Sequence, residues 1–393
     1  MKYLKKFETH ADYETYKDSQ DYITPNVSYC VDDIEAHYEK STPPPPETRL
    51  VYKLNVNDTS TSTNLVFYDS RAGRYLTNNF SDMEIDGVLL ERVTGVYQFD
   101  TTGEHTIKCT LIDDTVIGNM VFNQCSGITS VTIPDSVTSL SASVFNACTG
   151  LTSITIPDSV TSIGDSAFNQ CSGITSVTLP DSITSIGDSA FMYCTGLTSI
   201  TIPDSVTSLG SFAFRGCSGI TSVTIPDSVT SIGVNAFLDC TGLTSVTLSD
   251  SITSIGGQTF DNCTSLTSIT IPDSVTSIGV SAFNGCTSLT SITIPDSVTS
   301  LGIGVFNGCT NITSIVVGSG VTELTSFTFQ NCSSLISIIF NAVTPPTLSE
   351  SDDSVFRNTN NCTFYVPSES VSAYKSATGW RLYESRIEAI PGR

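Results

Sequence analysis

Residues 148–170 read CTGLTSITIPDSVTSIGDSAFNQ, and close variants of this 23-residue unit fill more than half of the chain. A phenylalanine stands three positions before each cysteine, from Phe122 to Phe329. The cysteines that mark the period are Cys125, Cys148, Cys171, Cys194, Cys217, Cys240, Cys263, Cys286, Cys309 and Cys332. A period of roughly 20–50 residues indicates a solenoid, in which each unit buries its apolar face only against its neighbours.

Within the unit, apolar residues stand three, six and eight positions after the cysteine, then twelve and fifteen, then nineteen and twenty. The alternation in residues 152–156 predicts a short strand, and stacked units turn such strands into a parallel sheet. Proline ends this strand in seven units, because it has no N–H to donate. We expect corners at Asp158 and Gly164, and one helical or 3₁₀ turn over residues 166–170.

The rest of the chain divides around the repeats. Residues 1–40 hold too few aliphatic side chains for a core of their own, and residues 41–48 form a proline-rich linker. Residues 49–111 alternate as strands do and predict a small β-sandwich that caps the first repeat. The repeats run over residues 112–345, and residues 346–393 form a capping segment. The predicted fold is therefore mostly β: a leader, a β-sandwich and a parallel solenoid.

The charge distribution restricts the partners. The chain has 39 acidic and 17 basic residues, a net charge of -22, and residues 111–340 contain no lysine and one arginine, Arg215. Such a surface repels nucleic acid and anionic membranes. No stretch reaches the roughly 20 apolar residues of a membrane span. The acidic residues that follow Met1, beginning at Glu8, are unlike a signal peptide.

Residues that carry chemistry are sparse. The three histidines, His10, His37 and His105, lie outside the repeats. Stacked cysteines are expected to be buried, reduced thiols, because a parallel pair does not readily reach the dihedral angle of a disulfide, about 90°; zinc binding is the alternative. The aspartates at 23-residue intervals are expected at corners, with weak cation binding as the alternative. We predict no catalytic residue, no metal and no cofactor, and hence no enzyme.

The unit resembles the leucine-rich repeats of the BspA-like, Treponema-type surface proteins, whose motif reads Cys-x-x-Leu-x-x-Ile-x-Ile-Pro-x-x-Val-x-x-Ile-Gly-x-x-Ala-Phe. The segment with Cys362, Tyr365, Tyr374, Trp380 and Tyr383 looks like the closing segment of gut Bacteroidetes members. This resemblance implies a leucine-rich-repeat solenoid that binds or adheres without catalysis. It also implies an aromatic cap on the open end.

The leader is similar to that of structural proteins of phages and prophages of Bacteroides-type hosts. The similarity covers about forty residues and includes the segment Lys5–Thr9. It implies that the leader docks onto a larger assembly of virion proteins. The candidate docking residues are Tyr13, Tyr16, Pro25, Asn26, Val27 and Tyr29.

The candidate binding surface lies where the repeat varies. Exposed aromatic residues and arginine are typical of interface cores, although drift explains such variation equally well. The outward strand positions read Ser-x-Thr in eight units and change to Val and Ile in the last two; the uniform rows are interpreted as a solvated strand face, with ice or glycan binding as the alternative. The candidate residues are Met192, Tyr193, Phe212, Arg215, Leu238, Asp239, Asp261, Val316 and Ile339.

These features predict a non-enzymatic structural and binding module. The first interpretation is a phage virion-associated protein, such as a tail, fibre or capsid-decoration protein, with a docked leader and a projecting solenoid. The alternative is a BspA-like adhesin at the bacterial surface, or one secreted without a recognisable signal peptide. The expected partners are other assembly proteins, a host protein or glycan, or a second copy of the chain.

Overall fold

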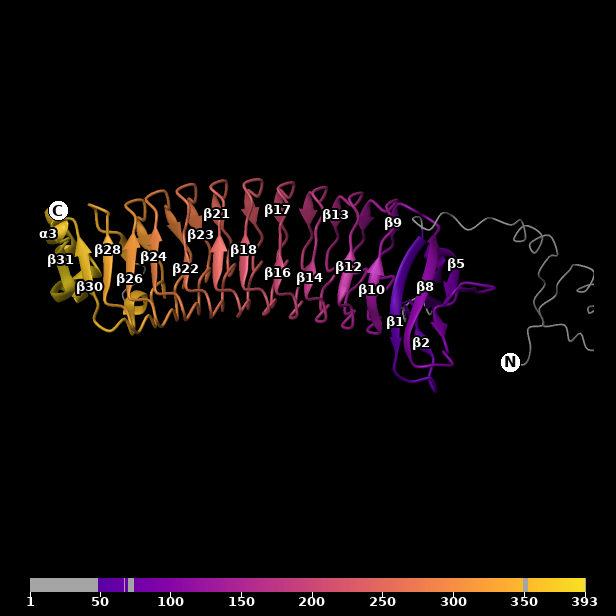
Figure 1. The fold of residues 1–393 in the computed structure, drawn as a ribbon. Coiled ribbons are helices and arrows are strands. Elements are labelled where there is room, and N and C mark those ends of the chain that lie inside the picture. Colours follow the sequence, from indigo (N-terminus) through magenta and orange to yellow (C-terminus); the bar gives the residue numbers. More distant parts are fainter. Residues whose placement is uncertain (1–48, 67, 70–73, 349–352, 393) are drawn as a thin grey trace, which may run out of the picture. The chain divides into compact units, whose positions relative to one another are not determined.

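The protein is described here from a computed structural model (Figure 1), which covers residues 49–66, 68–69, 74–348 and 353–392. The chain divides into two units, residues 1–44 and 45–393, and every described residue belongs to the second. The predicted leader and the predicted linker, residues 1–48, therefore lie outside the described residues. Among those described, no helix is long and apolar enough to span a bilayer.

The repeats form a parallel β-solenoid, which confirms the predicted fold class. Each 23-residue coil gives one strand to a first row and one to a second, and we call these rows the first sheet and the second sheet, although hydrogen-bonded pairing divides each row into shorter sheets. Equivalent residues of successive coils pair in register, as Ser130 does with Ser153 and Ser139 with Ser162. The first sheet contains β10 (Ile128–Thr132), β12 (Ser153–Thr155), β14 (Ser176–Val177), β16 (Ser199–Ile200), β18 (Ser222–Thr224), β20 (Ser245–Thr247), β22 (Ser268–Ile269), β24 (Ser291–Ile294), β26 (Ser314–Val317), β28 (Ser337–Phe340), β30 (Thr363–Val366) and β31 (Ile387–Ala389). The second contains β9 (Val116–Ile117), β11 (Ser139–Leu140), β13 (Ser162–Ile163), β15 (Ser185–Ile186), β17 (Ser208–Leu209), β19 (Ser231–Ile232), β21 (Ser254–Ile255), β23 (Ser277–Ile278), β25 (Ser300–Leu301), β27 (Glu323–Leu324) and β29 (Thr347–Leu348).

The third side of each coil, between the second strand and the next cysteine, is not the predicted helical or 3₁₀ turn. In the coil of Phe168, Ser166 and Gln170 have φ angles of 55° and 61°, in the left-handed region. The N–H groups of these three residues donate to carbonyls of the next coil at 2.7–2.8 Å. The left-handed backbone at Ser166 and Gln170 thus directs these N–H groups along the solenoid, whereas a helix would use them within its own turn.

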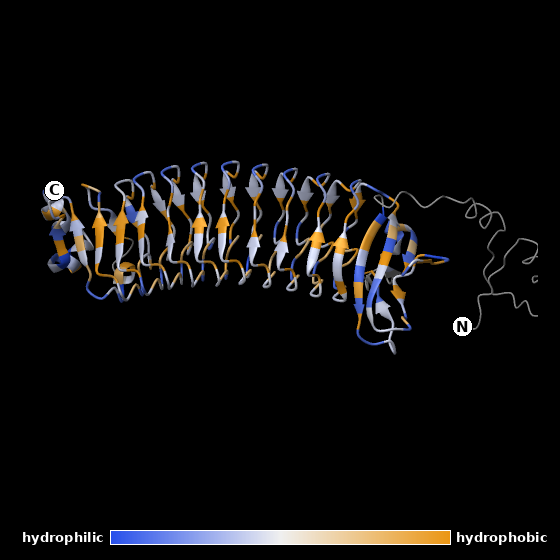
Figure 2. Cartoon of the chain, in the orientation of Figure 1, coloured by the Kyte–Doolittle hydropathy of each residue, from blue (hydrophilic) through white to orange (hydrophobic). Residues whose placement is uncertain are grey.

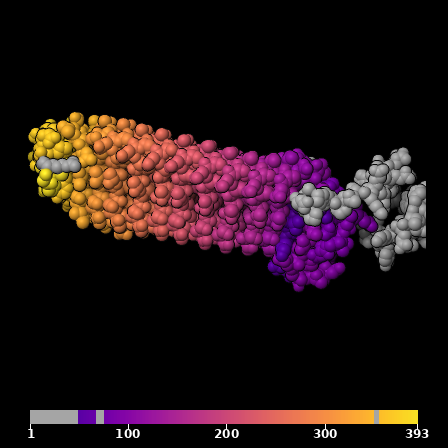
Figure 3. Space-filling view, turned by 45° about the horizontal axis from the view of Figure 1, so that its top comes forward, coloured from indigo at the N-terminus to yellow at the C-terminus, as the bar shows by residue number. Residues whose placement is uncertain are grey.

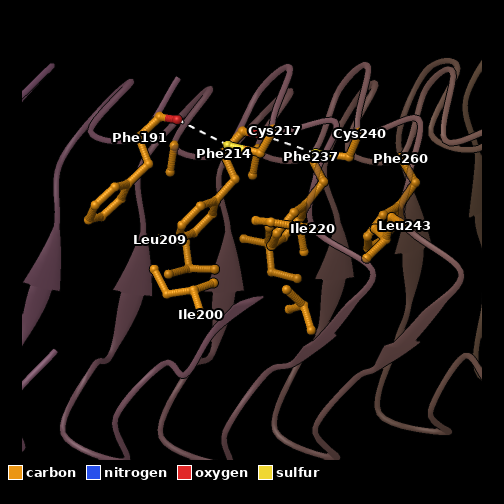
Figure 4. Packing of buried hydrophobic residues seen from close by; sticks show 14 of the residues in the cluster. Phe191, Ile200, Leu209, Phe214, Cys217, Ile220, Phe237, Cys240, Leu243 and Phe260 are labelled. Carbon is orange, nitrogen blue, oxygen red and sulfur yellow. Dashed lines mark hydrogen bonds between the residues drawn. The ribbon is translucent and has the colours of Figure 1, made fainter. Parts of the chain in front are cut away.

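The core is built from identical residues stacked coil on coil. Eleven phenylalanine rings, from Phe122 to Phe356, follow one another with centroids 5.2–6.0 Å apart and planes within 15°. Nine cysteine thiols, from Cys148 to Cys332, donate to the phenylalanine carbonyl of the preceding coil at 3.0–3.3 Å. Figure 4 shows this contact between Cys217 and Phe191. Burial raises the pKa of the Cys171 and Cys240 thiols to about 12, so the cysteine column acts as a set of small apolar donors.

The recurring corner glycine is explained by contact between coils. A Cβ atom placed on Gly210 would lie 2.5 Å from the carbonyl carbon of Gly187, its equivalent one coil earlier. The backbone at this corner does not have a positive φ, so glycine is needed here for space between coils and not for its conformational freedom.

The segment before the repeats forms a sheet that is continuous with the solenoid. Strands β1 (Arg49–Val56), β8 (Gly103–Leu111), β5 (Phe80–Ile85) and β6 (Val88–Leu89) are antiparallel, and β1 pairs antiparallel with β10 of the first repeat. The short pairs are β2 (Thr63–Asn64) with β7 (Val96–Tyr97) and β3 (Tyr68–Asp69) with β4 (Arg74–Tyr75), and a 3₁₀ turn, η2, covers Thr77–Asn79. This topology does not support the predicted β-sandwich, because β1, β8, β5 and β6 form one six-stranded sheet with β10 and β12 of the first repeats.

Both ends of the phenylalanine column meet other aromatic rings. At the start, the buried Tyr52 of β1 contacts Phe122 with centroids 5.1 Å apart. At the end, Phe356 meets Phe364 and Tyr383, with centroids 4.6 and 5.2 Å away, and Trp380, whose centroid is 5.9 Å away. The Trp380 Nε1–H donates to the Pro346 carbonyl at 2.7 Å. The closing segment contains η3 (Asp353–Phe356), η4 (Ser368–Ser370), α3 (Val371–Ser376) and η5 (Trp380–Arg386). These rings cover the ends of a core that stacking alone would leave open.

Candidate binding surface

The first sheet presents uniform rows of hydroxyl groups. Serine and threonine face outward on β12 to β24 and are exposed, as Ser153 and Thr155 are. Corner threonines differ, since the hydroxyl of Thr152 donates to the Thr129 carbonyl of the preceding coil at 3.0 Å. Repetition of one residue pair over many coils provides no position that distinguishes one partner from another.

An acidic edge runs along the corners that follow the first strands. All of these aspartates are exposed, and Figure 2 shows the corner loops as hydrophilic. Within the described residues, no group of three or more His, Cys, Asp or Glu is arranged to hold a metal ion. A groove of about 550 Å³ lies where this edge meets the last Ser-x-Thr strands, beside Asp273, Asp296 and Asn341. The aspartates of the edge are Asp135, Asp158, Asp181, Asp204, Asp227, Asp250, Asp273 and Asp296.

The variable third side brings four predicted residues together. The guanidinium carbon of Arg215 lies 5.6 Å from the centroid of the Tyr193 ring and 5.8 Å from that of Phe212. Arg215 Nε is 3.6 Å from Asp239 Oδ2, and both side chains are about one-third exposed, at 32% and 36%. Tyr193 is 37% exposed. We call Tyr193, Phe212, Arg215 and Asp239 the arginine cluster; it combines the residue types that carry most binding energy at interfaces.

The two aromatic residues of the arginine cluster occupy strained positions. Tyr193 has φ 57° and Phe212 has φ 58°. Most equivalent positions in other coils carry small or polar residues such as Ser189, Gly216 and Asn262, and Phe327, with φ 64°, is an exception. A left-handed conformation costs a residue with a side chain about 1–2 kcal/mol, and both rings are partly exposed. Their placement is therefore not explained by burial in the core.

Three other predicted residues of this side are less accessible. Leu238 is 7% exposed and Asp261 is 5% exposed, while Met192 is half-buried. The carboxylate of Asp261 accepts hydrogen bonds from Asn284 Nδ2 at 2.7 Å and Gln258 Nε2 at 3.2 Å. Leu238 and Asp261 thus support the third side from within and do not present a contact surface.

The predicted residues at the far end of the first sheet form a separate apolar area. Val316 of β26 pairs in register with Ile339 of β28, which pairs with Tyr365 of β30, and all three are half-buried. Ile336 nearby on the chain is 67% exposed. These residues replace the hydroxyl rows of the earlier coils and lie several coils away from the arginine cluster (Figure 3).

Sequence reasoning missed a row of exposed apolar residues on the third side. Val234, Val280 and Ile303 are 50–51% exposed, and Phe327 is 38% exposed. The first three directly follow the corner glycine, where Asp188 stands in an earlier coil. That change from acid to aliphatic residue was the available signal. The candidate docking residues Tyr13, Tyr16, Pro25, Asn26, Val27 and Tyr29 lie outside the described residues.

Comparisons with known proteins agree with this architecture. The family described as "BspA type Leucine rich repeat region" matches in six copies at residues 115–244, 185–276 and 254–377, which together span more than half of the chain. A leucine-rich repeat protein from Bacteroides ovatus is similar in structure, with a TM-score of 0.50 and 22% identity over 77% of this chain and 94% of that one. A leucine rich cell surface protein from Faecalibacterium prausnitzii gives a TM-score of 0.42 and 27% identity, over 72% and 88%. The pneumococcal vaccine antigen PcpA gives 0.42 and 22%, over 65% and 70%. No curated protein matches the chain.

Proposed function

This chain belongs to the BspA-type leucine-rich repeat family, and we propose that it is a non-enzymatic adhesin-type binding module that acts at a bacterial surface or after secretion. Leucine-rich repeat proteins are in general binding modules, because a stacked solenoid offers a long, rigid surface to a partner. We further propose that the partner is a host protein or glycan.

The arginine cluster is the observation that carries this proposal. It holds the single cation of residues 111–340, placed between two aromatic rings and beside a carboxylate. Tyrosine, phenylalanine and arginine together on a rigid scaffold are the composition of an interface core. The strained backbone under both rings is a cost in stability, and contact with a partner accounts for retaining it.

The family match supports the adhesin class better than the virion role that the leader sequence favours. Docking of residues 1–40 onto a particle stays a prediction, because these residues lie outside those described. It is tested by deleting residues 1–40, which should abolish incorporation into particles and leave the solenoid folded. Unchanged incorporation would contradict the docking role.

The adhesin proposal is tested by returning the arginine cluster to the repeat consensus. The triple variant Tyr193→Gln, Phe212→Ser and Arg215→Asn places on each position a residue that stands at the equivalent position of another coil, as Gln170, Ser189 and Asn169 do, so the fold is kept. The purified full chain and the variant are titrated onto cultured epithelial cells and onto arrays of extracellular-matrix proteins and mucin glycans. We expect the variant to bind at least about tenfold more weakly, since that corresponds to one interface hot spot.

A matched control keeps the arginine cluster and changes the uniform rows. Thr201→Tyr with Thr224→Tyr alters two exposed residues on neighbouring strands of the first sheet. Binding should survive in this control if the third side is the contact surface. Loss of binding in the control, with full binding by the consensus variant, would instead favour a glycan or ice binder that uses the hydroxyl rows.

A further inference from the structure

His105 lies on the buried face of β8, and both of its ring nitrogens have close partners. Nδ1 is 2.6 Å from Oδ2 of Asp86, and Nε2 is 3.0 Å from the carbonyl oxygen of Thr101. The ring also packs on Phe99, with centroids 4.2 Å apart, and the residue is 7% exposed. His105 thus ties β8 to the β5–β6 turn and to the loop after β7.

The partners of His105 determine how many protons the ring carries. A backbone carbonyl accepts hydrogen bonds and donates none, and the same holds for an ionised carboxylate. Neutral imidazole has one N–H and one bare nitrogen, so it satisfies only one of these two partners. Both contacts are made together only when the ring is doubly protonated and positively charged.

Asp86 is held in place by more than the histidine. Its Oδ1 accepts the Thr106 N–H at 2.8 Å, and its own N–H donates to the Thr106 carbonyl at 2.9 Å. Asp86 and Gly87 have φ angles of 49° and 85° and form the two-residue turn between β5 and β6. The pairing of β5 with β8 ends at Ile85, opposite Ile107, so Asp86 fixes the turn that lies just beyond this ladder.

The β5–β6 hairpin ends in an exposed edge strand. β6 is the edge strand of its six-stranded sheet, and Val88 and Leu89 on it are each 65% exposed. An edge strand with exposed apolar residues is a template for pairing with another strand. Its position therefore affects what the sheet presents to other chains.

We propose that His105 is a pH-sensitive clasp, which fixes the β5–β6 turn to β8 while the ring carries two protons and loosens the turn when it loses one. This inference is independent of the binding function proposed above, because it concerns the sheet before the repeats and not the arginine cluster. The released partner is either the Asp86 carboxylate or the Thr101 carbonyl, since the neutral ring retains one donor.

Asp86 is the charged group that faces the His105 ring. Burial alone would lower the pKa of His105, but the hydrogen bonds with Asp86 and Thr101 and the Asp86 charge raise it above its ordinary value. Leu54, its register partner on β1, is apolar. The pairs Lys53–Glu104 and Lys108–Glu84 belong to residues that alternate with His105 and so lie on the other face of the sheet.

The sign of the effect follows from the raised pKa. A group whose folded pKa lies above its unfolded pKa stabilises the fold below the unfolded value, and this contribution is lost as the pH rises through the folded pKa. The clasp is therefore closed at mildly acidic pH and opens as the pH rises through the raised pKa of His105.

The test follows ring and hairpin together in the full chain. Histidine ring carbons are labelled with ¹³C, the hairpin amides with ¹⁵N, and both are recorded by NMR from about pH 5 to about pH 10, across the range in which histidine titrates. His105→Phe identifies the His105 signal among those of the three histidines. We expect the Gly87–Leu89 amides to shift with the same midpoint as the His105 ring, above the ordinary histidine value.

Two variants make the outcome decisive. Asp86→Asn keeps a residue suited to the left-handed turn but removes the charge, and should lower the midpoint. Glu104→Gln changes a carboxylate on the other face and should leave the midpoint where it was. A His105 midpoint at or below the ordinary value, or hairpin amides that ignore it, would overturn the proposal; so would an unchanged midpoint in Asp86→Asn.

Discussion

The corner glycine offers a sharp test of how the coils are held together. A Cβ atom on Gly210 would lie 2.5 Å from the carbonyl carbon and 2.6 Å from the oxygen of Gly187, both backbone atoms. Ordinary contact begins at 3.4 Å, so the variant Gly210→Ala must separate two coils by about 0.9 Å, the difference between 3.4 and 2.5 Å. Overpacking of this kind typically costs about 1–3 kcal/mol.

The unfolded chain changes in the opposite direction. Replacing glycine by alanine lowers the entropy of the unfolded state and gains about 0.4–1 kcal/mol where the native backbone accepts it. Gly210→Ala should therefore destabilise the solenoid by about 1–2 kcal/mol in total. Gly257→Ala is the matched control, because its nearest contact, the Val280 oxygen, is at 3.4 Å and its φ is not positive. That variant should be neutral or slightly stabilised.

The assay is urea unfolding of both full-length variants, followed by far-ultraviolet circular dichroism. A shift of the midpoint at constant m-value reports a change of stability, whereas a changed m-value reports loss of a single cooperative transition. Equal stability of Gly210→Ala and Gly257→Ala would contradict the inference that close approach of the coils requires glycine at position 210. In that case the repeated glycine would have a role other than close approach of the coils.

Three further outcomes follow from the core and the edges. Phe237→Ala removes a ring stacked at 5.3 and 5.7 Å between two others, and should cost about 3–5 kcal/mol in the same unfolding assay. Burial raises the pKa of Cys240 to about 12, so a thiol reagent at about pH 8 should label the cysteine column only after unfolding. The test uses the variant Cys30→Ser, which lacks the one cysteine outside the described residues, and rapid labelling of this folded chain would contradict the expectation. The Ser319 N–H lowers the pKa of Asp296, whose stabilising contribution is thus present above the ordinary aspartate value and lost as the pH falls below it. The stability difference between the wild type and Asp296→Asn should shrink over that range, and a pH-independent difference would argue against the contact.

The sequence was sufficient for the parts of the fold that depend on side-chain identity. Cysteine, phenylalanine and isoleucine recur because each packs against its equivalent one coil away, and the 23-residue period predicts this stacking. The turn of the third side was not predictable in the same way, because Ser166 and Gln170 are ordinary residues that hold a left-handed backbone only through hydrogen bonds to the next coil. Tertiary contact decided the conformation there, against local preference.

The first strands show a second limit. The alternation of apolar and polar residues in β1 predicts a strand with one buried face, but it does not predict which strand pairs with β1. The pairing of β1 with β10 merges the predicted sandwich with the solenoid sheet. In the arginine cluster, by contrast, residue type and variability together were enough to select Tyr193, Phe212, Arg215 and Asp239, while the burial of Asp261 depended on the amide of Asn284.

The three sides of the solenoid differ in how freely a residue can change, and this difference bears on where we propose that recognition occurs. On the third side, backbone N–H and carbonyl groups join successive coils. Side-chain amides at the Arg215 position add bonds between some coils, as Asn146 Nδ2 does to Asn123 Oδ1 at 2.7 Å, and the backbone ladder continues where Arg215 replaces them. Corner threonines of the other sides donate side-chain hydrogen bonds to the preceding coil, which restricts them. Random substitution is tolerated best on a surface that varies freely. At left-handed positions, however, it would favour glycine, asparagine or serine. Phe327 also holds such a position, with φ 64°, so an aromatic ring there is not by itself a sign of a partner. The proposed contact surface rests instead on the two rings that lie against the same arginine, Tyr193 and Phe212.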